Sequence, residues 1–119
     1  MWCRGIRGAT IVAENTREAI LASSRELLQQ IVAANGVEVD DVAFILFTTT
    51  PDLNAAFPAV AARELGWSQV ALLCSHEMDV PGSQHHCLRV LMLVNTEKKS
   101  DEIVHVYHKG AEVLRPDLG

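Results

Sequence analysis

Four arginines of this 119-residue chain lie within apolar or glycine-rich sequence, namely Arg7, Arg63, Arg89 and Arg115. The adjacent lysines at residues 98 and 99 instead fall in a predicted surface turn. The planar guanidinium group binds a carboxylate or phosphate through two parallel hydrogen bonds. Their placement is therefore consistent with a pocket for a small anion. For each arginine taken alone, the simpler interpretation is a side chain whose stem covers a sheet while its charged end reaches water.

His85, His86 and Cys87 are adjacent residues of types that bind metal ions, and His76 lies nearby. Adjacent residues of an extended segment point in opposite directions, so His85 and His86 are not expected to share one ion. The sequence also lacks the Cys-x-x-Cys and His-x-x-x-His spacings of common metal sites. It therefore predicts a solvated loop here, and no bound metal.

Neither a nucleophile nor an acid–base pair is specified by the sequence. Cys74 precedes Ser75 and His76, but sequence neighbours do not make a catalytic triad, because the base must approach the nucleophile in space. Glu77 and Asp79 could act as an acid–base pair, although two surface carboxylates are the simpler interpretation of that spacing in a loop.

Composition limits the class of protein. The net charge of −5 argues against nucleic acid and anionic membranes as partners. No apolar run approaches the roughly 18 residues of a membrane span, and no apolar stretch follows Arg4 and Arg7 as it would in a secretion signal. Cys3, Cys74 and Cys87 are odd in number and not closely paired, which favours reduced thiols. We therefore expect a cytoplasmic protein.

One long helix is predicted over residues 17–34, where apolar side chains recur with a period near 3.6. Asn15 or Thr16 is expected to cap its start, and Gly36 follows its end. Shorter elements follow from β-branched runs, breakers and turn residues: strands at residues 3–12, 42–50, 70–74, 87–94 and 103–107, a short helix at 58–65 and a loop at 76–86. The predicted fold is α+β, one small domain over residues 1–119 in which the long helix covers one face of a mixed sheet.

Four blocks of sequence, in order and at matching spacing over nearly the whole chain, resemble the monofunctional AroH class of chorismate mutases. They are RGIRGAT at residues 4–10, TPDL with AFPA and AREL between 50 and 65, EMDV with CLRV between 77 and 90, and HVY with LRPDL between 105 and 118. The resemblance implies rearrangement of chorismate to prephenate, in the biosynthesis of aromatic amino acids. It also implies a homotrimer with active sites between neighbouring subunits, and neither metal nor organic cofactor.

The resemblance further implies three catalytic residues, Arg89, Glu77 and Arg7. Arg89 would lie near the breaking ether oxygen and one carboxylate of chorismate. Arg7 would hold a carboxylate, and Glu77 would accept a hydrogen bond from the ring hydroxyl. Six further residues would hold, wall or cover the substrate: Tyr107, Cys74, Phe57, Arg63, Leu114 and Arg115.

One position departs from the resembled family, because Val60 stands where many relatives carry a lysine. Loss of a cation near a pocket mouth is expected to affect substrate capture more than chemistry. Two alternatives stay open from the residues themselves. One is a non-catalytic oligomer that binds a small anion, and the other is an acid–base enzyme that uses Glu77 and a histidine.

Overall fold

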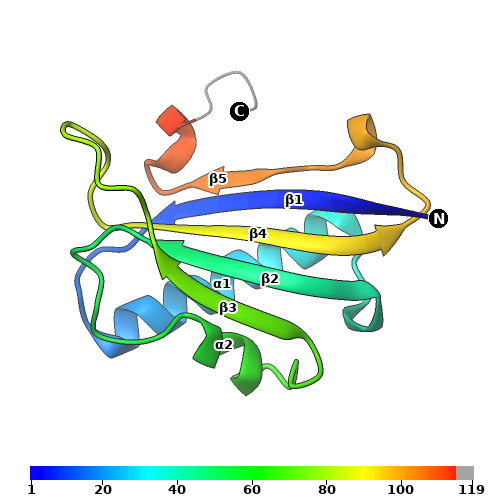
Figure 1. The fold of residues 1–119 in the computed structure, drawn as a ribbon, viewed down its shortest axis with the longest axis horizontal. Helices are drawn as coiled ribbons and strands as arrows, with labels where there is room; N and C mark the ends of the chain where they lie inside the picture. Colours follow the sequence, from blue (N-terminus) through cyan, green and yellow to red (C-terminus); the bar gives the residue numbers. More distant parts are fainter. Residues whose placement is uncertain (115–119) are drawn as a thin grey trace.

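The structure is a computed structural model that describes residues 1–114. Its elements follow one another as β1 (Trp2–Ile11), α1 (Arg17–Asn35), η1 (Val39–Asp41), β2 (Val42–Thr49), α2 (Ala59–Glu64), β3 (Ala71–His76), β4 (Cys87–Thr96), η2 (Ser100–Glu102), β5 (Val106–His108) and η3 (Ala111–Leu114). The five strands form one sheet in the order β3-β2-β4-β1-β5 (Figure 1). β4 is antiparallel to both neighbours, while β1 pairs with β5 and β2 with β3 in parallel.

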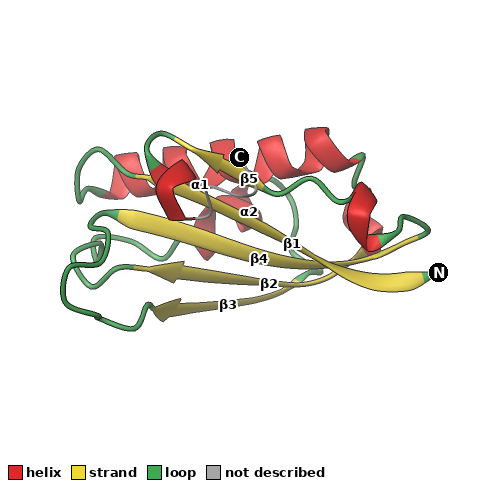
Figure 2. Ribbon diagram, turned by 90° about the horizontal axis from the view of Figure 1, so that it is seen from above, coloured by secondary structure: helices red, strands yellow, loops and turns green. Residues whose placement is uncertain are grey.

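The two α-helices lie on the same side of the sheet (Figure 2). On that side, alternate residues of each central strand are buried, and in β4 these are Leu88, Val90, Met92 and Val94. The intervening residues, such as Arg89 and Leu91, point to the opposite face, which no helix of residues 1–114 covers. The predicted mixed sheet with a long helix on one face is therefore confirmed.

α1 begins and ends where local chemistry requires. The Thr16 hydroxyl oxygen accepts a hydrogen bond from the Ala19 backbone N–H at 3.1 Å, and Gly36 ends the helix in the left-handed conformation at φ 61°. Asn15, the alternative cap, instead accepts hydrogen bonds from the Asn54 and Ala55 backbone N–H groups.

Within residues 1–114, no helix combines the length and apolar character that crossing a bilayer requires.

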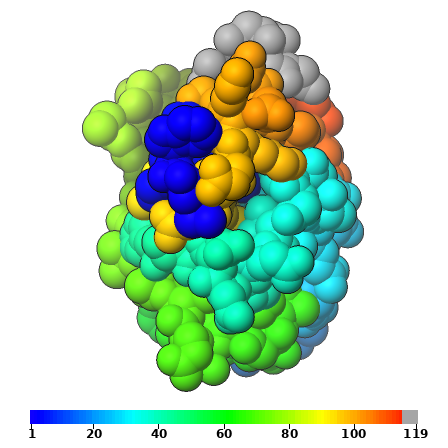
Figure 3. All heavy atoms as spheres, turned by 90° about the vertical axis from the view of Figure 1, so that its right-hand side faces the viewer, coloured from blue at the N-terminus to red at the C-terminus, as the bar shows by residue number. Residues whose placement is uncertain are grey.

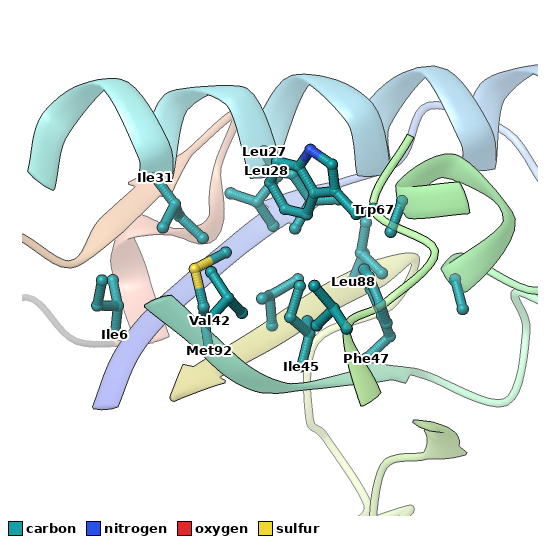
Figure 4. Close-up of a cluster of buried hydrophobic side chains, with 14 of the residues drawn as sticks. Ile6, Leu27, Leu28, Ile31, Val42, Ile45, Phe47, Trp67, Leu88 and Met92 are labelled. Carbon is teal, nitrogen blue, oxygen red and sulfur yellow. The ribbon is translucent and has the colours of Figure 1, made fainter. Parts of the chain in front are cut away.

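The core lies between α1 and the sheet. Leu27, Leu28 and Ile31 of the helix face Ile45, Phe47 and Met92 of the strands (Figure 4). Gly8 of β1 allows this close approach, because a Cβ atom there would lie 2.7 Å from Ile31 Cδ1. The apolar side chains of the helix and those of the strands therefore pack into one core layer.

The fifth strand is shorter and later than predicted, since β5 begins only at Val106. The reason is a long-range contact. The side chain of Asn35, at the end of α1, accepts a hydrogen bond from the Val104 N–H and donates one to the Val104 carbonyl, at 2.8 and 2.9 Å. His105 Nδ1 also accepts the hydrogen bond of the Arg7 backbone N–H. These side chains occupy backbone groups that a longer strand would have used.

The N-terminal residues pack against the segment that follows β4, at the end of the molecule seen in Figure 3. Arg4 donates hydrogen bonds to the Lys98 carbonyl and the Ser100 hydroxyl, at 3.1 and 2.9 Å. The Met1 amino group lies 3.5 Å from a carboxylate oxygen of Glu97. These contacts hold the start of β1 beside the end of β4. They therefore support the pairing of the two strands along their whole length, which places Arg7 opposite Leu91.

Candidate active site

The uncovered face of the sheet carries charged side chains near the end where β2 finishes and β4 begins. In β4, Leu88 and Val90 are buried against the helices, so Arg89 between them points to the uncovered face. Strand pairing places Arg89 directly opposite Thr48 of β2. Arg7 of β1 is paired with Leu91, two residues further along β4, and shares the same face.

Glu77 meets Arg89 on this face. The backbone N–H of Glu77 donates to the Thr49 carbonyl at 2.7 Å, which fixes the residue immediately after β3. Its carboxylate accepts a hydrogen bond from the Thr48 hydroxyl and lies 3.7 Å from Nε of Arg89. The Arg89 side chain remains 45% exposed, so its guanidinium group has donors left for a ligand.

Two adjoining cavities open around this pair. A cavity of about 230 Å³ is lined by Arg7, Gly8, Leu46, Thr48, Glu77, Arg89, Val90, Leu91 and Tyr107. A second, of about 270 Å³, shares Glu77 and Arg89 and extends beneath the loop after β3 to Leu114. The structure thus brings five of the predicted site residues to these two cavities, and two of them, Arg7 and Arg89, are arginines in the same cavity as Glu77. An excess of positive charge in a partly desolvated hollow suits an anionic ligand.

A different group of predicted residues lies elsewhere. Phe57 and Cys74 line a cavity of about 450 Å³ that shares no lining residue with the two around Arg89. Burial raises the pKa of the Cys74 thiol, although a backbone hydrogen bond from Ala59 and the nearby charge of Arg63 act in the opposite direction. The thiol therefore stays protonated near neutral pH and is a poor nucleophile. Arg115 falls outside the described residues.

His85 and His86 do not lie in an extended segment, and the expectation that their side chains point in opposite directions is wrong. Residues 85 and 86 are not extended, because His86 has a left-handed backbone with φ 52°. Both rings consequently approach Asp52, with His85 Nδ1 at 3.6 Å and His86 Nε2 at 3.8 Å from Oδ2. In the part of the chain that the structure describes, no group of three or more His, Cys, Asp or Glu side chains is arranged to hold a metal ion.

Sequence reasoning missed two residues of these cavities. Thr48 binds Glu77, and its only sequence signal is its place in the alternation of β2, where it follows the half-buried Leu46 on the uncovered face. Arg17 lines the large cavity with Phe57 and Cys74. Its place at the first position of a helix carries no signal of a ligand, and the nearby contact with the loop at residues 54–57 is made by Asn15, just before that helix, which hydrogen-bonds to Asn54 and Ala55.

The family model for type I chorismate mutases matches residues 3–118 of the chain. The chain belongs to the type I chorismate mutase family. The chorismate mutase AroH of Bacillus subtilis (strain 168) is 49% identical over 119 residues, which cover 99% of this chain and 94% of that protein. The chorismate mutase AroH of Thermus thermophilus is 49% identical over 116 residues, or 97% and 95% of the two chains.

A solved structure of a chorismate mutase from Clostridium thermocellum superimposes with a TM-score of 0.91 at 51% sequence identity, covering 95% of this chain and 99% of that one. The resemblance found in the four sequence blocks is thus confirmed at the level of the type I chorismate mutase family. The rearrangement that names the family is a single concerted step, so it requires no nucleophile.

Proposed function

We propose that the chain converts chorismate to prephenate, and that Arg7, Glu77 and Arg89 form the charged half of its active site. The observation that carries this proposal is the Arg89 guanidinium beside Glu77, at 3.7 Å, in a cavity that also contains Arg7 and Tyr107. Chorismate is a dianion, and the cavity offers two cations within reach of one bound molecule. Family membership at 49% identity supports the same reaction, which belongs to the biosynthesis of aromatic amino acids.

The chemistry requires confinement and charge rather than proton transfer. A carbon–oxygen bond of chorismate breaks while a carbon–carbon bond forms, so the substrate must be held with its two ends in contact. The ether oxygen becomes electron-rich in the transition state. A guanidinium group already aimed at that oxygen stabilises the transition state more than the ground state, and this difference accelerates the reaction. Arg89 takes this role.

Glu77 and Thr48 support Arg89. The Thr48 hydroxyl donates to Glu77, and this hydrogen bond holds the carboxylate next to Nε of Arg89. One carboxylate oxygen of Glu77 then remains for the ring hydroxyl of chorismate. Arg7 and Tyr107 hold a substrate carboxylate, and Leu114 walls the cavity on the side reached by η3. Arg115, for which the family resemblance implies a role near the bound substrate, lies outside the described residues.

The second half of the site comes from a neighbouring subunit of a homotrimer. Within one chain, Phe57 and Cys74 line a cavity that shares no residue with the two cavities around Arg89, and Arg63 lines none of these three cavities. The uncovered face also exposes Leu73, which is 57% accessible to solvent in the single chain, and the adjoining loop after β3 exposes Met78, which is 83% accessible. A closed ring of subunits would bury such a face and bring the two groups together.

No other reaction is favoured by a specific contact. Within residues 1–114, neither cavity that contains Glu77 is lined by a histidine, so the geometry does not favour acid–base catalysis by such a pair. We place the enzyme in the cytoplasm, and the free state of Cys3, Cys74 and Cys87 is compatible with a reducing compartment.

The reaction is tested by incubating the purified protein with chorismate and following the loss of its absorbance together with the formation of prephenate. A sedimentation mass of the active species tests the trimer. Absence of prephenate from a folded protein would refute the function, and an active monomer would refute the shared site.

Mixing two inactive variants tests the shared site directly. In a ring where each site joins Arg89 of one subunit to Phe57 of the next, trimers mixed from Arg89→Ala and Phe57→Asp subunits contain an intact site. Random reassembly of equal amounts should restore about a quarter of the wild-type activity. No restoration in mixed trimers of verified composition would mean that each site is built within one subunit.

A further inference from the structure

The loop at residues 77–86 connects the two charged groups of the site, and both of its ends are attached to the same short stretch at the end of β2. At its start, the Glu77 backbone N–H donates to the Thr49 carbonyl at 2.7 Å. At its far end, the Thr50 N–H donates to the Cys87 carbonyl at 3.0 Å. Figure 1 shows the loop leaving the end of β3, extending beyond the sheet and returning to the start of β4. Residues 49 and 50 thus hydrogen-bond both to Glu77 and to the start of β4, two residues before Arg89.

Asp52 is the charged member of that stretch. Its carboxylate accepts hydrogen bonds from the Thr50 hydroxyl and from the His86 backbone N–H, the latter at 3.2 and 3.1 Å to its two oxygens. Burial by itself would raise the pKa of Asp52. The hydrogen bonds from Thr50 and His86, with the charges of His86 and His85, outweigh burial and hold the pKa below its ordinary value. The carboxylate is therefore ionised throughout the range in which the enzyme would work.

Thr50 carries the effect of this carboxylate to β4. A hydroxyl group has one hydrogen, and an ionised carboxylate can only accept, so the hydrogen of Thr50 Oγ1 points to Asp52. The lone pairs of Oγ1 are then directed to the Cys87 backbone N–H, which donates to them at 3.0 Å. Cys87 begins β4, two residues before Arg89. An oriented hydroxyl next to a charge makes a stronger and better-defined bond than a freely rotating one.

His86 is held in an unfavourable conformation at the same place. Its φ of 52° lies in the left-handed region, which non-glycine residues rarely adopt without support from their surroundings. Two residues provide this support: Asp52 accepts the hydrogen bond of the His86 N–H, and Val12 contacts both the His86 carbonyl and the His86 ring. The Val12 N–H donates to the His86 carbonyl at 2.7 Å, and His86 Nδ1 lies 3.0 Å from the Val12 carbonyl oxygen.

We propose that Asp52 is a positioning residue of the active site, which sets the start of β4, and thereby the Arg89 guanidinium relative to Glu77, through Thr50 and the His86 backbone. The proposal rests on the role given above to Arg89. Asp52 lines neither cavity that contains Arg89, so it acts without touching the substrate. Its replacement should therefore alter turnover through geometry and leave the capture of chorismate nearly intact.

The test compares Asp52→Asn with Glu102→Gln in kcat, KM and free energy of unfolding. Glu102 is a matched control, because its carboxylate also accepts a backbone N–H, that of Lys99 at 2.8 Å, in a different part of the molecule. Asp52→Asn should lower kcat about tenfold with KM within about twofold, since a small misplacement of the reacting groups is costly. Glu102→Gln should leave kcat unchanged. A folded Asp52→Asn enzyme with normal kcat would overturn the proposal.

A double-substitution cycle separates positioning from general destabilisation. In an Arg89→Lys background the well-placed guanidinium is already gone, so adding Asp52→Asn should change the remaining kcat by less than about twofold. An equal loss in both backgrounds would show that Asp52 does not act through Arg89. Normal kcat in Arg89→Lys alone would instead refute the role of Arg89, and hence the proposed function.

Thr50 offers a second route if Asp52→Asn fails to fold. Thr50→Val removes the hydroxyl at nearly constant volume, and it should lower kcat in the same direction. Thr50→Ser restores the hydroxyl and should recover most of kcat. Equal kcat for the valine and serine variants would overturn the relay from Asp52 to Cys87.

Discussion

The two faces of the sheet are built from alternate residues of the same strands, yet they differ in almost every physical property. Towards α1, residues such as Phe47 and Met92 are fully buried. On the opposite face, their sequence neighbours Thr48 and Leu91 line a cavity with Arg7 and the other charged groups. A shift of one residue along a strand thus separates the closed core from the open site.

The contrast separates stability from function. The closed face contains apolar side chains that gain from leaving water, and their packing holds the strands in place. The open face keeps charged groups with unused donors and exposed apolar side chains, which do little for a single folded chain. Substitutions on the closed face should therefore change the free energy of unfolding and have little effect on turnover. Substitutions on the open face should change turnover and have little effect on the free energy of unfolding.

The largest effect is expected on the closed face. Phe47→Ala should lower the free energy of unfolding by about 3–5 kcal/mol, because it removes a fully buried aromatic ring and leaves a cavity. Denaturant unfolding at fixed protein concentration measures the change. Val104→Ala, at a site that is 48% exposed, is the control and should cost much less. Similar losses for the two variants would contradict the division between the faces.

Arg89→Gln should have the largest effect on the open face. It removes the charge at the ether oxygen and should lower kcat about a hundredfold, or ~3 kcal/mol in activation free energy. The free energy of unfolding should scarcely change, because the pair with Glu77 is partly exposed. Arg25→Gln, which breaks a surface pair with Glu64 at 3.3 Å, is the matched control with normal kcat. An Arg89→Gln enzyme of near-normal kcat would remove Arg89 from the mechanism.

Two glycines of β1 allow the two faces to be compared by adding one methyl group to each. A Cβ atom at Gly8 would lie 2.7 Å from Ile31 Cδ1 on the closed side, whereas one at Gly5 would meet Leu91 and Leu93 at 3.4 and 3.6 Å. Gly8→Ala should therefore destabilise the protein by about 1–3 kcal/mol through overpacking. Gly5→Ala should stay within about 0.5 kcal/mol. Thermal unfolding of both variants decides, and equal stability would mean that α1 can shift to accept the methyl group.

The smallest effect is expected at Arg63, which lies outside the cavities around Arg89 and is exposed. Arg63→Ala should raise KM about fivefold, or ~1 kcal/mol, with little change in kcat, because in the proposed trimer its charge lies at the pocket mouth of a neighbouring subunit and acts on substrate capture. The effect should weaken as salt concentration rises, since mobile ions screen exposed charges. Steady-state kinetics at two ionic strengths provides the measurement. A large fall in kcat at unchanged KM would instead place Arg63 at the reacting atoms.

Local patterns predicted most of the secondary structure. The helix predicted over residues 17–34 is observed at Arg17–Asn35, because its cap, its apolar period and its terminal glycine act within a few residues of one another. The fifth strand was misplaced because its start depends on Asn35, which lies 69 positions away from Val104 in the chain. A sequence window around Val104 contains no sign of that contact.

The sequence by itself determined the family, through four ordered blocks, and the strand parity that directs Arg89 away from the core. Only the tertiary structure decided that Glu77 meets Thr48 and Arg89, and that His85 and His86 converge on Asp52. It also decided that Phe57 and Cys74 lie in a cavity apart from Arg89. The physical reason is range: propensities and caps act between near neighbours in sequence, whereas these encounters depend on strand order and on the bend at His86.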